Sequence, residues 1–378
     1  MIPQGNKQIK CVLVPELEAD DEDYFRIMED MVQNGGDLVP DPNWLVPFES
    51  EGVSGDKEKG LKFALSEEGY RRRFSKMTSL MPAWIGSTND ELHSPDTLPK
   101  YCRFLEHGDP LGLWQANVTK SQNGIPLRQA DLGSIMDLTM IYVFTSSHEA
   151  QVTRILEVGG GYGRLAEAAF NIFGRSLQYV LVDAVPGSLY YSRQYLSRAC
   201  PGARIKSYYD DGSQDLDLDG ADIAIVPAWH FDRVNKYSYD VCVNIESMQE
   251  MNQWHVDHYL GLFDSVAADG ATIYISNARG YYFRGSFNYP SNWQRLFSSN
   301  TPRSWRRNHP TEIFRKTSTD CSFQNSVVDS AYNYGLWQLQ DPAEFISRNG
   351  CKDVIVPLSR GIVRAVTWRC RRAFSHQA

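Results

Sequence analysis

The sequence predicts an α/β protein. Its doubly wound, seven-stranded sheet should end in a C-terminal antiparallel hairpin, with a mainly helical region before the sheet. From about residue 151, short apolar runs alternate with segments of helical spacing, which favours parallel strands joined by crossover helices. The first run reads as a buried strand and ends in a row of glycines. Two runs near the C-terminus flank a short Ser-Arg-Gly turn and predict the hairpin.

The chain divides into two parts at about residue 150. Residues 1–150 are interrupted by Pro, Gly and Asn, and two segments of helical spacing, 61–81 and 128–147, predict a helical cap, lid or dimerisation region. Residues 151–378 should form the sheet domain. Its segment 280–330, rich in Asn, Ser, Arg and aromatic residues, is expected to be an insertion at the carboxyl edge, where such sheets bind ligands.

Each element of the sheet domain follows from its hydrophobic period and from the residues that bound it. Strands are expected at 153–158, 178–184, 221–227, 239–245, 271–277, 352–358 and 364–370. Helices are expected at 164–174, 187–200 and 248–270. Gly174 marks the end of the first helix.

Composition excludes several classes of protein. The net charge of −8 argues against a nucleic-acid partner, because phosphate binding needs a basic field. The 7 cysteines include no C-x-x-C pair, so we expect reduced thiols and neither a disulfide framework nor a zinc site. No apolar run approaches the ~18 residues of a membrane span, and the first residues become acidic too soon for a signal peptide. A cytoplasmic protein is therefore expected.

The stretch ILEVGGGYGRLAEAAF, residues 155–170, carries the strongest functional signal. Its glycines follow a buried strand and open a helix, so the chain turns tightly there and a ligand can lie against bare backbone. The glycines are Gly159, Gly160, Gly161 and Gly163. Residues 161–166 loosely satisfy the dinucleotide pattern G-x-G-x-x-G/A, with Asp183 at a plausible distance.

The alternative pattern is acid-x-G-x-G-x-G, which binds S-adenosylmethionine (SAM), and every position of it fits from Glu157 onward. Glu157 can receive the ammonium group of the ligand, whereas it would repel a pyrophosphate. Asp183 ends the second strand, where its carboxylate can accept from the ribose hydroxyls. With the terminal hairpin, which dinucleotide domains usually lack, these features favour SAM.

The stretches EVGGGYGRLAE, LVDAVPGSLYYSRQYL and YDVCVNIESMQEM resemble class I SAM-dependent methyltransferases, and among them the sugar O-methyltransferase family. The resemblance covers about 155–277. It does not extend to the first 120 residues or to 280–330, where an acceptor would be chosen. It implies a SAM cofactor and a site that includes Asn244, while the acceptor stays open.

Methyl transfer to a hydroxyl needs a base, whereas a carboxylate acceptor needs only a cationic clamp. Plant-type small-molecule O-methyltransferases place a histidine shortly after the fourth strand, and Gln249 and Glu250 stand at about that place here. The expected catalytic residues are Glu250, Gln249 and, further along the helix, His255. His255 and His258 form no convincing metal site, and no metal is expected.

Further residues are expected to contact the cofactor or the acceptor. Trp229, His230 and Arg128 are candidates for the cofactor; the first two follow the third strand, where an adenine would stack. The residues expected to bind the methyl acceptor are Glu246, Arg303, Arg306, Arg307 and His309. The arginines are included because a guanidinium can bind a carboxylate with two hydrogen bonds.

The sequence therefore predicts a SAM-dependent O-methyltransferase of small molecules, with an anionic acceptor favoured and a hydroxyl acceptor, sugar-type or other, as the alternative. More remote alternatives are an N-methyltransferase, a nicotinamide-dependent oxidoreductase and a SAM-binding protein without chemistry. A homodimer is possible for this fold class.

Overall fold

The fold comes from a computed structural model. It describes residues 21–40, 66, 68, 109–115, 129–146, 152–210, 218, 220–279, 286–300 and 308–321. Everything below concerns these residues. None of the helices among them is long and apolar enough to cross a membrane.

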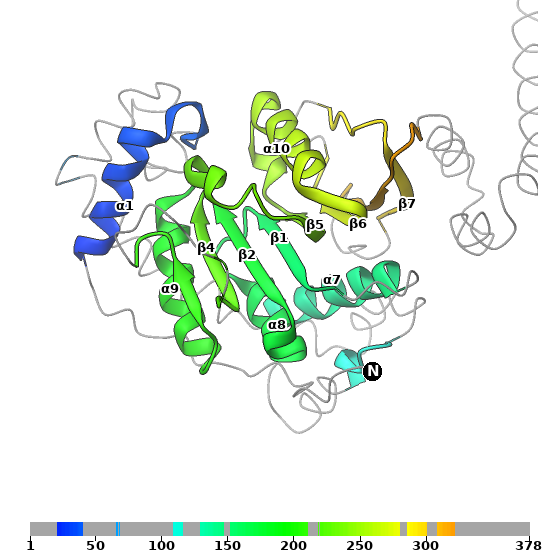
Figure 1. Ribbon diagram of the computed structural model, residues 1–378, viewed down its shortest axis with the longest axis horizontal. Helices are drawn as coiled ribbons and strands as arrows, with labels where there is room; N and C mark the ends of the chain where they lie inside the picture. Colours follow the sequence, from blue (N-terminus) through cyan, green and yellow to red (C-terminus); the bar gives the residue numbers. More distant parts are fainter. Residues whose placement is uncertain are drawn as a thin grey trace, which may run out of the picture.

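One sheet of eight strands organises the described chain (Figure 1). In chain order the strands are β1 (Arg154–Val158), β2 (Gln178–Asp183), β3 (Ile205–Ser207), β4 (Ile223–Pro227), β5 (Tyr239–Ile245), β6 (Ala267–Ser276), β7 (Trp293–Ser299) and β8 (Thr311–Lys316). Their order across the sheet is β3-β4-β2-β1-β5-β6-β8-β7. The pairs from β3 to β6 are parallel, and β8 runs antiparallel to both β6 and β7.

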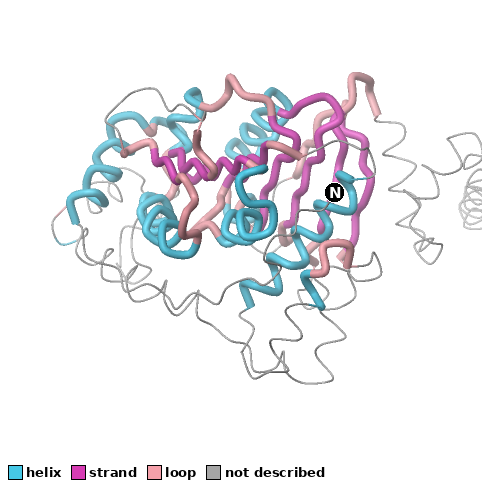
Figure 2. Tube along the Cα trace, turned by 60° about the horizontal axis from the view of Figure 1, so that its bottom comes forward, coloured by secondary structure: helices cyan, strands magenta, loops and turns pink. Residues whose placement is uncertain are grey.

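Helices cover both faces of the sheet (Figure 2). They are α1 (Asp21–Asn34), η1 (Gly36–Leu38), α7 (Gln129–Ser146), α8 (Arg164–Phe173), η4 (Gly174–Ser176), α9 (Pro186–Ala199), η5 (Ala228–Arg233), η6 (Met248–Glu250) and α10 (Gln253–Val266). The buried side chains of α1, α7, α8 and α9 share one core cluster, and those of α10 belong to the other. The two clusters are the hydrophobic cores on the two faces of the sheet.

Local sequence explains the central elements. β1, β2, β4 and β5 are near-continuous apolar runs, as strands covered on both faces require, and nearly all their residues are buried. Asn252 starts α10, because its side chain accepts a hydrogen bond from the backbone N–H of His255. Because β1 and β2 are parallel, with Val158 paired to Val182, their carboxyl ends lie together.

The mixed α/β sheet and its central strands and helices confirm the prediction, and the described residues add three details to it. The described residues form eight strands where seven were predicted for the whole sheet: five match predicted strands, and β3, β7 and β8 were not predicted. The helix expected over 248–270 is shorter, since Asn252 caps α10 and β6 already begins at Ala267. Within the predicted insertion at 280–330, β7 and β8 provide the antiparallel strands of the part of the sheet that the structure describes. The hairpin expected at 352–370 lies outside the described residues.

Candidate functional site

The glycine loop after β1 has backbone angles that favour glycine. Gly159 has φ +74° and donates its N–H to Val182 O at 2.7 Å. A side chain there would place Cβ 1.9 Å from Ser247 Oγ. Gly161 has φ +56°, yet nothing lies within 4 Å of the position its Cβ would take. The loop is therefore packed at its base, while the backbone at Gly161 faces open space.

Asp183, at the carboxyl end of β2, is tied to this loop. One carboxylate oxygen accepts from Gly161 N at 2.9 Å and the other from Val185 N at 2.8 Å. Burial raises the pKa of Asp183 to about 6, although the backbone hydrogen bonds work against that rise. The loop thus sits against a carboxylate that retains further acceptor capacity for a hydroxyl-bearing ligand.

Glu157, at the end of β1, is a second buried carboxylate beside the loop. It accepts from Tyr179 OH at 2.8 Å, and burial raises its pKa to about 7. The nearby Arg164 guanidinium favours its charged form, but Arg164 is itself paired with the buried Asp137 at 2.9 Å. Counting Glu157, Asp183 and Asp137 against Arg164, the surroundings of the loop carry an excess of acid.

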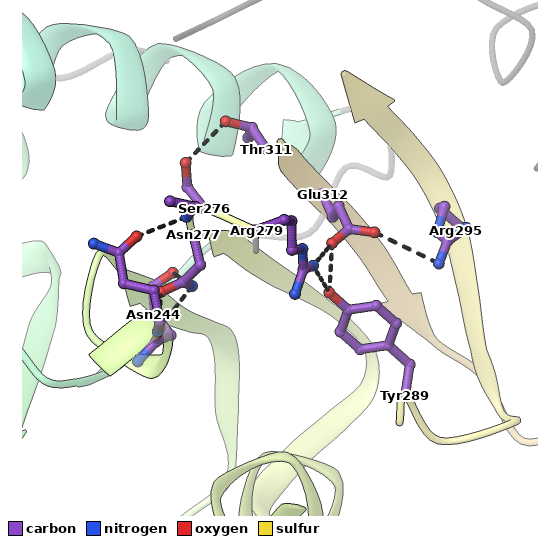
Figure 3. Close-up of polar contacts among 10 residues, drawn as sticks. Asn244, Ser276, Asn277, Arg279, Tyr289, Arg295, Thr311 and Glu312 are labelled. Atoms are coloured by element: carbon purple, nitrogen blue, oxygen red, sulfur yellow. Dashed lines mark hydrogen bonds and ion pairs between the residues drawn. The ribbon is translucent and has the colours of Figure 1, made fainter. Parts of the chain in front are cut away.

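The side chain of Asn244, near the end of β5, is hydrogen-bonded to several neighbouring segments (Figure 3). Its amide donates to Val158 O at 2.8 Å, and its carbonyl oxygen accepts from Met248 N and from Asn277 Nδ2. The side chain is fully buried. Asn244 therefore joins the ends of three strands; we expected it to contact a cofactor, and that contact stays a prediction.

The turn after β5 carries two acids. Glu246 has φ +57°, a left-handed conformation uncommon for a side-chain-bearing residue, and such strain often marks functional sites. The Glu250 side chain is exposed, yet the protein atoms around it remove part of its hydration and, with the Glu246 carboxylate, raise its pKa to about 7. Gln249 ties this turn to the end of β6, because its side-chain Oε1 accepts from Ala278 N at 2.6 Å and its backbone N–H donates to Asn277 Oδ1. The roles expected for Glu246, Gln249 and Glu250 stay predictions.

Three of the expected site residues hold the N-terminal helix instead. Trp229 Nε1 donates to Asp30 Oδ2 at 2.8 Å, and His230 Nε2 lies 3.0 Å from both oxygens of the same carboxylate. His255 Nε2 donates to Asp37 O at 2.9 Å. These side chains contact α1 and η1, and their expected roles with adenine or in catalysis stay predictions.

Sequence reasoning missed an ionic cluster beyond the end of β6 (Figure 3). The Arg279 guanidinium is hydrogen-bonded to the Glu312 carboxylate and, at 2.7 Å, to Tyr289 OH. Arg295 Nη2 approaches the other Glu312 oxygen at 3.5 Å. Two guanidinium groups thus share one carboxylate, and Arg279 Nη1 is buried without a hydrogen-bond partner. The only sequence signal was an arginine three residues after a strand.

Arg279 lies close to the turn after β5. The Ala278 N–Gln249 Oε1 hydrogen bond joins the residues immediately before Arg279 and Glu250. The cationic cluster and the acidic turn are therefore neighbours at the carboxyl edge.

Of the remaining predicted site residues, the structure describes only His309. Arg128, Arg303, Arg306 and Arg307 lie outside the described residues. His309 is fully buried just before β8. Within the described ranges, no group of three or more His, Cys, Asp or Glu side chains is placed to hold a metal ion.

No protein-family model and no curated protein sequence matches this chain, so the resemblance to sugar O-methyltransferases stays a prediction. Among solved structures, TehB from Haemophilus influenzae matches at a TM-score of 0.31 and 13% identity, covering 46% of this chain and 60% of TehB. A methyltransferase from Escherichia coli, yhhF, matches at 0.33 and 10%, covering 49% of this chain and 86% of yhhF. The plantazolicin methyltransferase BpumL in complex with SAH matches at 0.26 and 10%, covering 55% and 60%. At these scores the matches add nothing to the geometry of the site.

Proposed function

We propose that this protein is a SAM-dependent methyltransferase that transfers a methyl group to an oxygen of a small anionic molecule. The observation that carries the cofactor assignment is the open backbone at Gly161, which is hydrogen-bonded to Asp183, in a loop whose Gly160 lies against the buried Glu157. The carboxyl edge of a doubly wound sheet, where strand order reverses, is the general place for ligands. In the order β2-β1-β5, this reversal falls beside β1.

The charges favour SAM over a dinucleotide. SAM carries a sulfonium and an ammonium group, and both are attracted by carboxylates in a low-dielectric site. A pyrophosphate placed at the same loop would meet the carboxyl groups of Glu157 and Asp183, while the guanidinium of Arg164 is already paired with Asp137. Asp183, at the end of the second strand, is suited to accept from ribose hydroxyls.

The ionic cluster beyond β6 supports an anionic acceptor. Arg279 and Arg295 face the single Glu312, which leaves one positive charge in excess among these three side chains. Arg279 Nη1 is a donor without a protein partner, and arginine binds carboxylates with directional, charge-assisted hydrogen bonds. A carboxylate acceptor is already ionised near neutral pH. Its methylation requires alignment with the sulfonium methyl and no general base.

A hydroxyl acceptor is the second candidate, and Glu250 is the observation that favours it. A carboxylate with a pKa of about 7 is well matched to take a proton from a hydroxyl near neutral pH. In that mechanism Glu250 removes the hydroxyl proton as the oxygen attacks the methyl group.

Isotope-labelled SAM, offered with a panel of dicarboxylic acids and a panel of neutral sugars, tests both candidates. We expect labelled methyl esters from the acids and little effect of Glu250→Gln on kcat. Turnover with neutral sugars alone, lost in Glu250→Gln by about 10²–10⁴-fold, would exclude the carboxylate and establish the hydroxyl acceptor. Consumption of NADH in place of methyl transfer would identify an oxidoreductase.

A further inference from the structure

Arg164, the first residue of α8, is held by two side chains of the neighbouring helix α7. Its Nη1 donates to Ser134 Oγ at 3.1 Å, and its Nη2 is paired with Asp137 Oδ2 at 2.9 Å. Gly133 leaves room for this arrangement, because a Cβ there would lie 3.1 Å from Nη1. Figure 1 shows α7 and α8 side by side. The guanidinium is therefore fixed in place directly after the glycine loop.

Asp137 explains why Arg164 takes this position. The Asp137 carboxylate is fully buried and also accepts from Tyr274 OH of β6 at 2.7 Å. A buried carboxylate without a cation is strongly destabilising, and Arg164 supplies the cation here. Because α7 carries Asp137 and β6 binds it, both elements fix the guanidinium as well.

The pairing with α7 leaves part of the Arg164 guanidinium available. A guanidinium has more N–H groups than Ser134 and Asp137 use, and 21% of the Arg164 side chain is exposed. The charge of Arg164 also acts on Glu157, whose ionised form it favours. Glu157 in turn borders the glycine loop, because a Cβ on Gly160 would lie 3.1 Å from Glu157 Oε2. A fixed cation and a carboxyl group are thus neighbours beside the loop.

The amino-acid end of SAM matches this pair of charges. It carries an ammonium and a carboxylate group on one carbon atom, so a protein that binds one of them meets the other close by. If Glu157 receives the ammonium, the adjoining carboxylate needs a cation in the same neighbourhood. Arg164 is the cation that acts on Glu157. A pyrophosphate, by contrast, has no positive group to offer Glu157.

We propose that Arg164 binds the carboxylate at the amino-acid end of the cofactor, opposite Glu157, which receives the ammonium group. This inference rests on the proposed function, because it takes SAM as the ligand. Ser134 and Asp137 are positioning residues, since they hold the guanidinium for that contact. The site therefore selects adenosyl compounds with an intact amino-acid end, which S-adenosylhomocysteine (SAH) keeps. Decarboxylated SAM keeps the sulfonium and ammonium groups but lacks the carboxylate, and it binds more weakly.

Calorimetric affinities for SAM and for decarboxylated SAM test this inference. Arg164→Gln removes the cation but leaves Asp137 buried without its partner. The double variant Arg164→Gln/Asp137→Asn removes both charges and so avoids that unpaired carboxylate. Arg204→Gln is the matched control, because its guanidinium also pairs with a buried carboxylate, that of Asp222, beside the edge strand β3.

We expect the wild type and Arg204→Gln to prefer SAM over decarboxylated SAM by about tenfold or more, and both variants that lack Arg164 to lose this preference. A purely structural role would weaken both ligands equally, and an acidic site alone would favour the more positive decarboxylated SAM. No preference in the wild type, or a preference that survives in the double variant, would overturn the inference. If Arg164→Gln does not fold, the double variant decides. Failure of the wild type to bind SAM at all would instead contradict the proposed function.

Discussion

The two halves of the carboxyl edge differ in how they handle charge. Beside β1 and β2, carboxylates dominate: Glu157 and Asp183 are buried, and burial raises both pKa values. Beyond β6, guanidinium groups dominate, and Arg279 and Arg295 share Glu312. An acidic half suits a cationic cofactor and a basic half suits an anionic acceptor. Under the proposed function, the cofactor and the acceptor would therefore be separated along this edge by the sign of their charge.

Asn244 lies between the halves. It is hydrogen-bonded to the end of β1 through Val158 and to the residue after β6 through Asn277. A neutral, fully buried amide therefore lies between the carboxylates beside β1 and β2 and the guanidinium groups beyond β6, and it fixes the strand ends that carry them. Variants confined to one half should affect one ligand only.

The largest expected effect is on the pH dependence of stability, and it comes from the buried carboxylates of the acidic half in the ligand-free protein. Because the pKa of Glu157 is raised to about 7 in the fold, the folded state holds a proton there that the unfolded chain releases at lower pH. The apo protein should therefore lose about 2–3 kcal/mol of unfolding free energy between pH 5 and 8 through Glu157. In Glu157→Gln this share of the loss should disappear. Asp183, with its pKa at about 6, contributes with the same sign.

Chemical denaturation at several pH values measures this effect. Subtracting the variant's pH profile from that of the wild type cancels the other titrating groups. Equal slopes in the two proteins would mean that Glu157 is not held neutral. Saturating SAM, whose ammonium group favours the carboxylate, should flatten the slope of the wild type.

The next effect concerns the loop itself. Gly161→Ala and Gly270→Ala place Cβ at positions with φ +56° and +81°, and neither meets an atom within 4 Å. Both should cost about 1 kcal/mol of stability through the left-handed backbone. Only Gly161→Ala puts the methyl group where the cofactor would lie, so it alone should weaken SAH binding, by about 100-fold. Equal SAH affinities in the two variants would place the ligand elsewhere.

Sequence patterns were sufficient to predict the strands, the loop and the acidic residues of the half beside β1 and β2. The apolar runs of β1 and β2, the glycines between strand and helix, and an acid at the end of each strand are local features. The buried positions of Glu157 and Asp183 agree with their predicted neighbourhood. The strands, the glycine loop and both carboxylates all lie within residues 154–183.

The basic half was not predictable in the same way. β7 carries Arg295 and β8 carries Glu312, so neither segment reads as a buried strand until these charges are seen to pair with each other and with Arg279. Asp30 binds Trp229, 199 positions along the chain, and no local period reports such a contact. The missed features are tertiary ones.

A smaller effect should follow from a change in the basic half. Arg279→Gln removes one guanidinium from the shared carboxylate and should raise KM for an anionic acceptor by about tenfold, leaving SAH affinity unchanged. Arg204→Gln is a control, because Arg204 also pairs with a carboxylate, Asp222, but lies before β3. An unchanged KM in Arg279→Gln would remove the argument for an anionic acceptor.

Calorimetric titration of the purified protein tests the central claim, that the loop at 159–163 and its flanking carboxylates bind SAM. We predict saturable heat with SAH at one site per chain, and no heat with NAD. The absence of heat with SAH, together with clean saturation by NAD, would contradict the account.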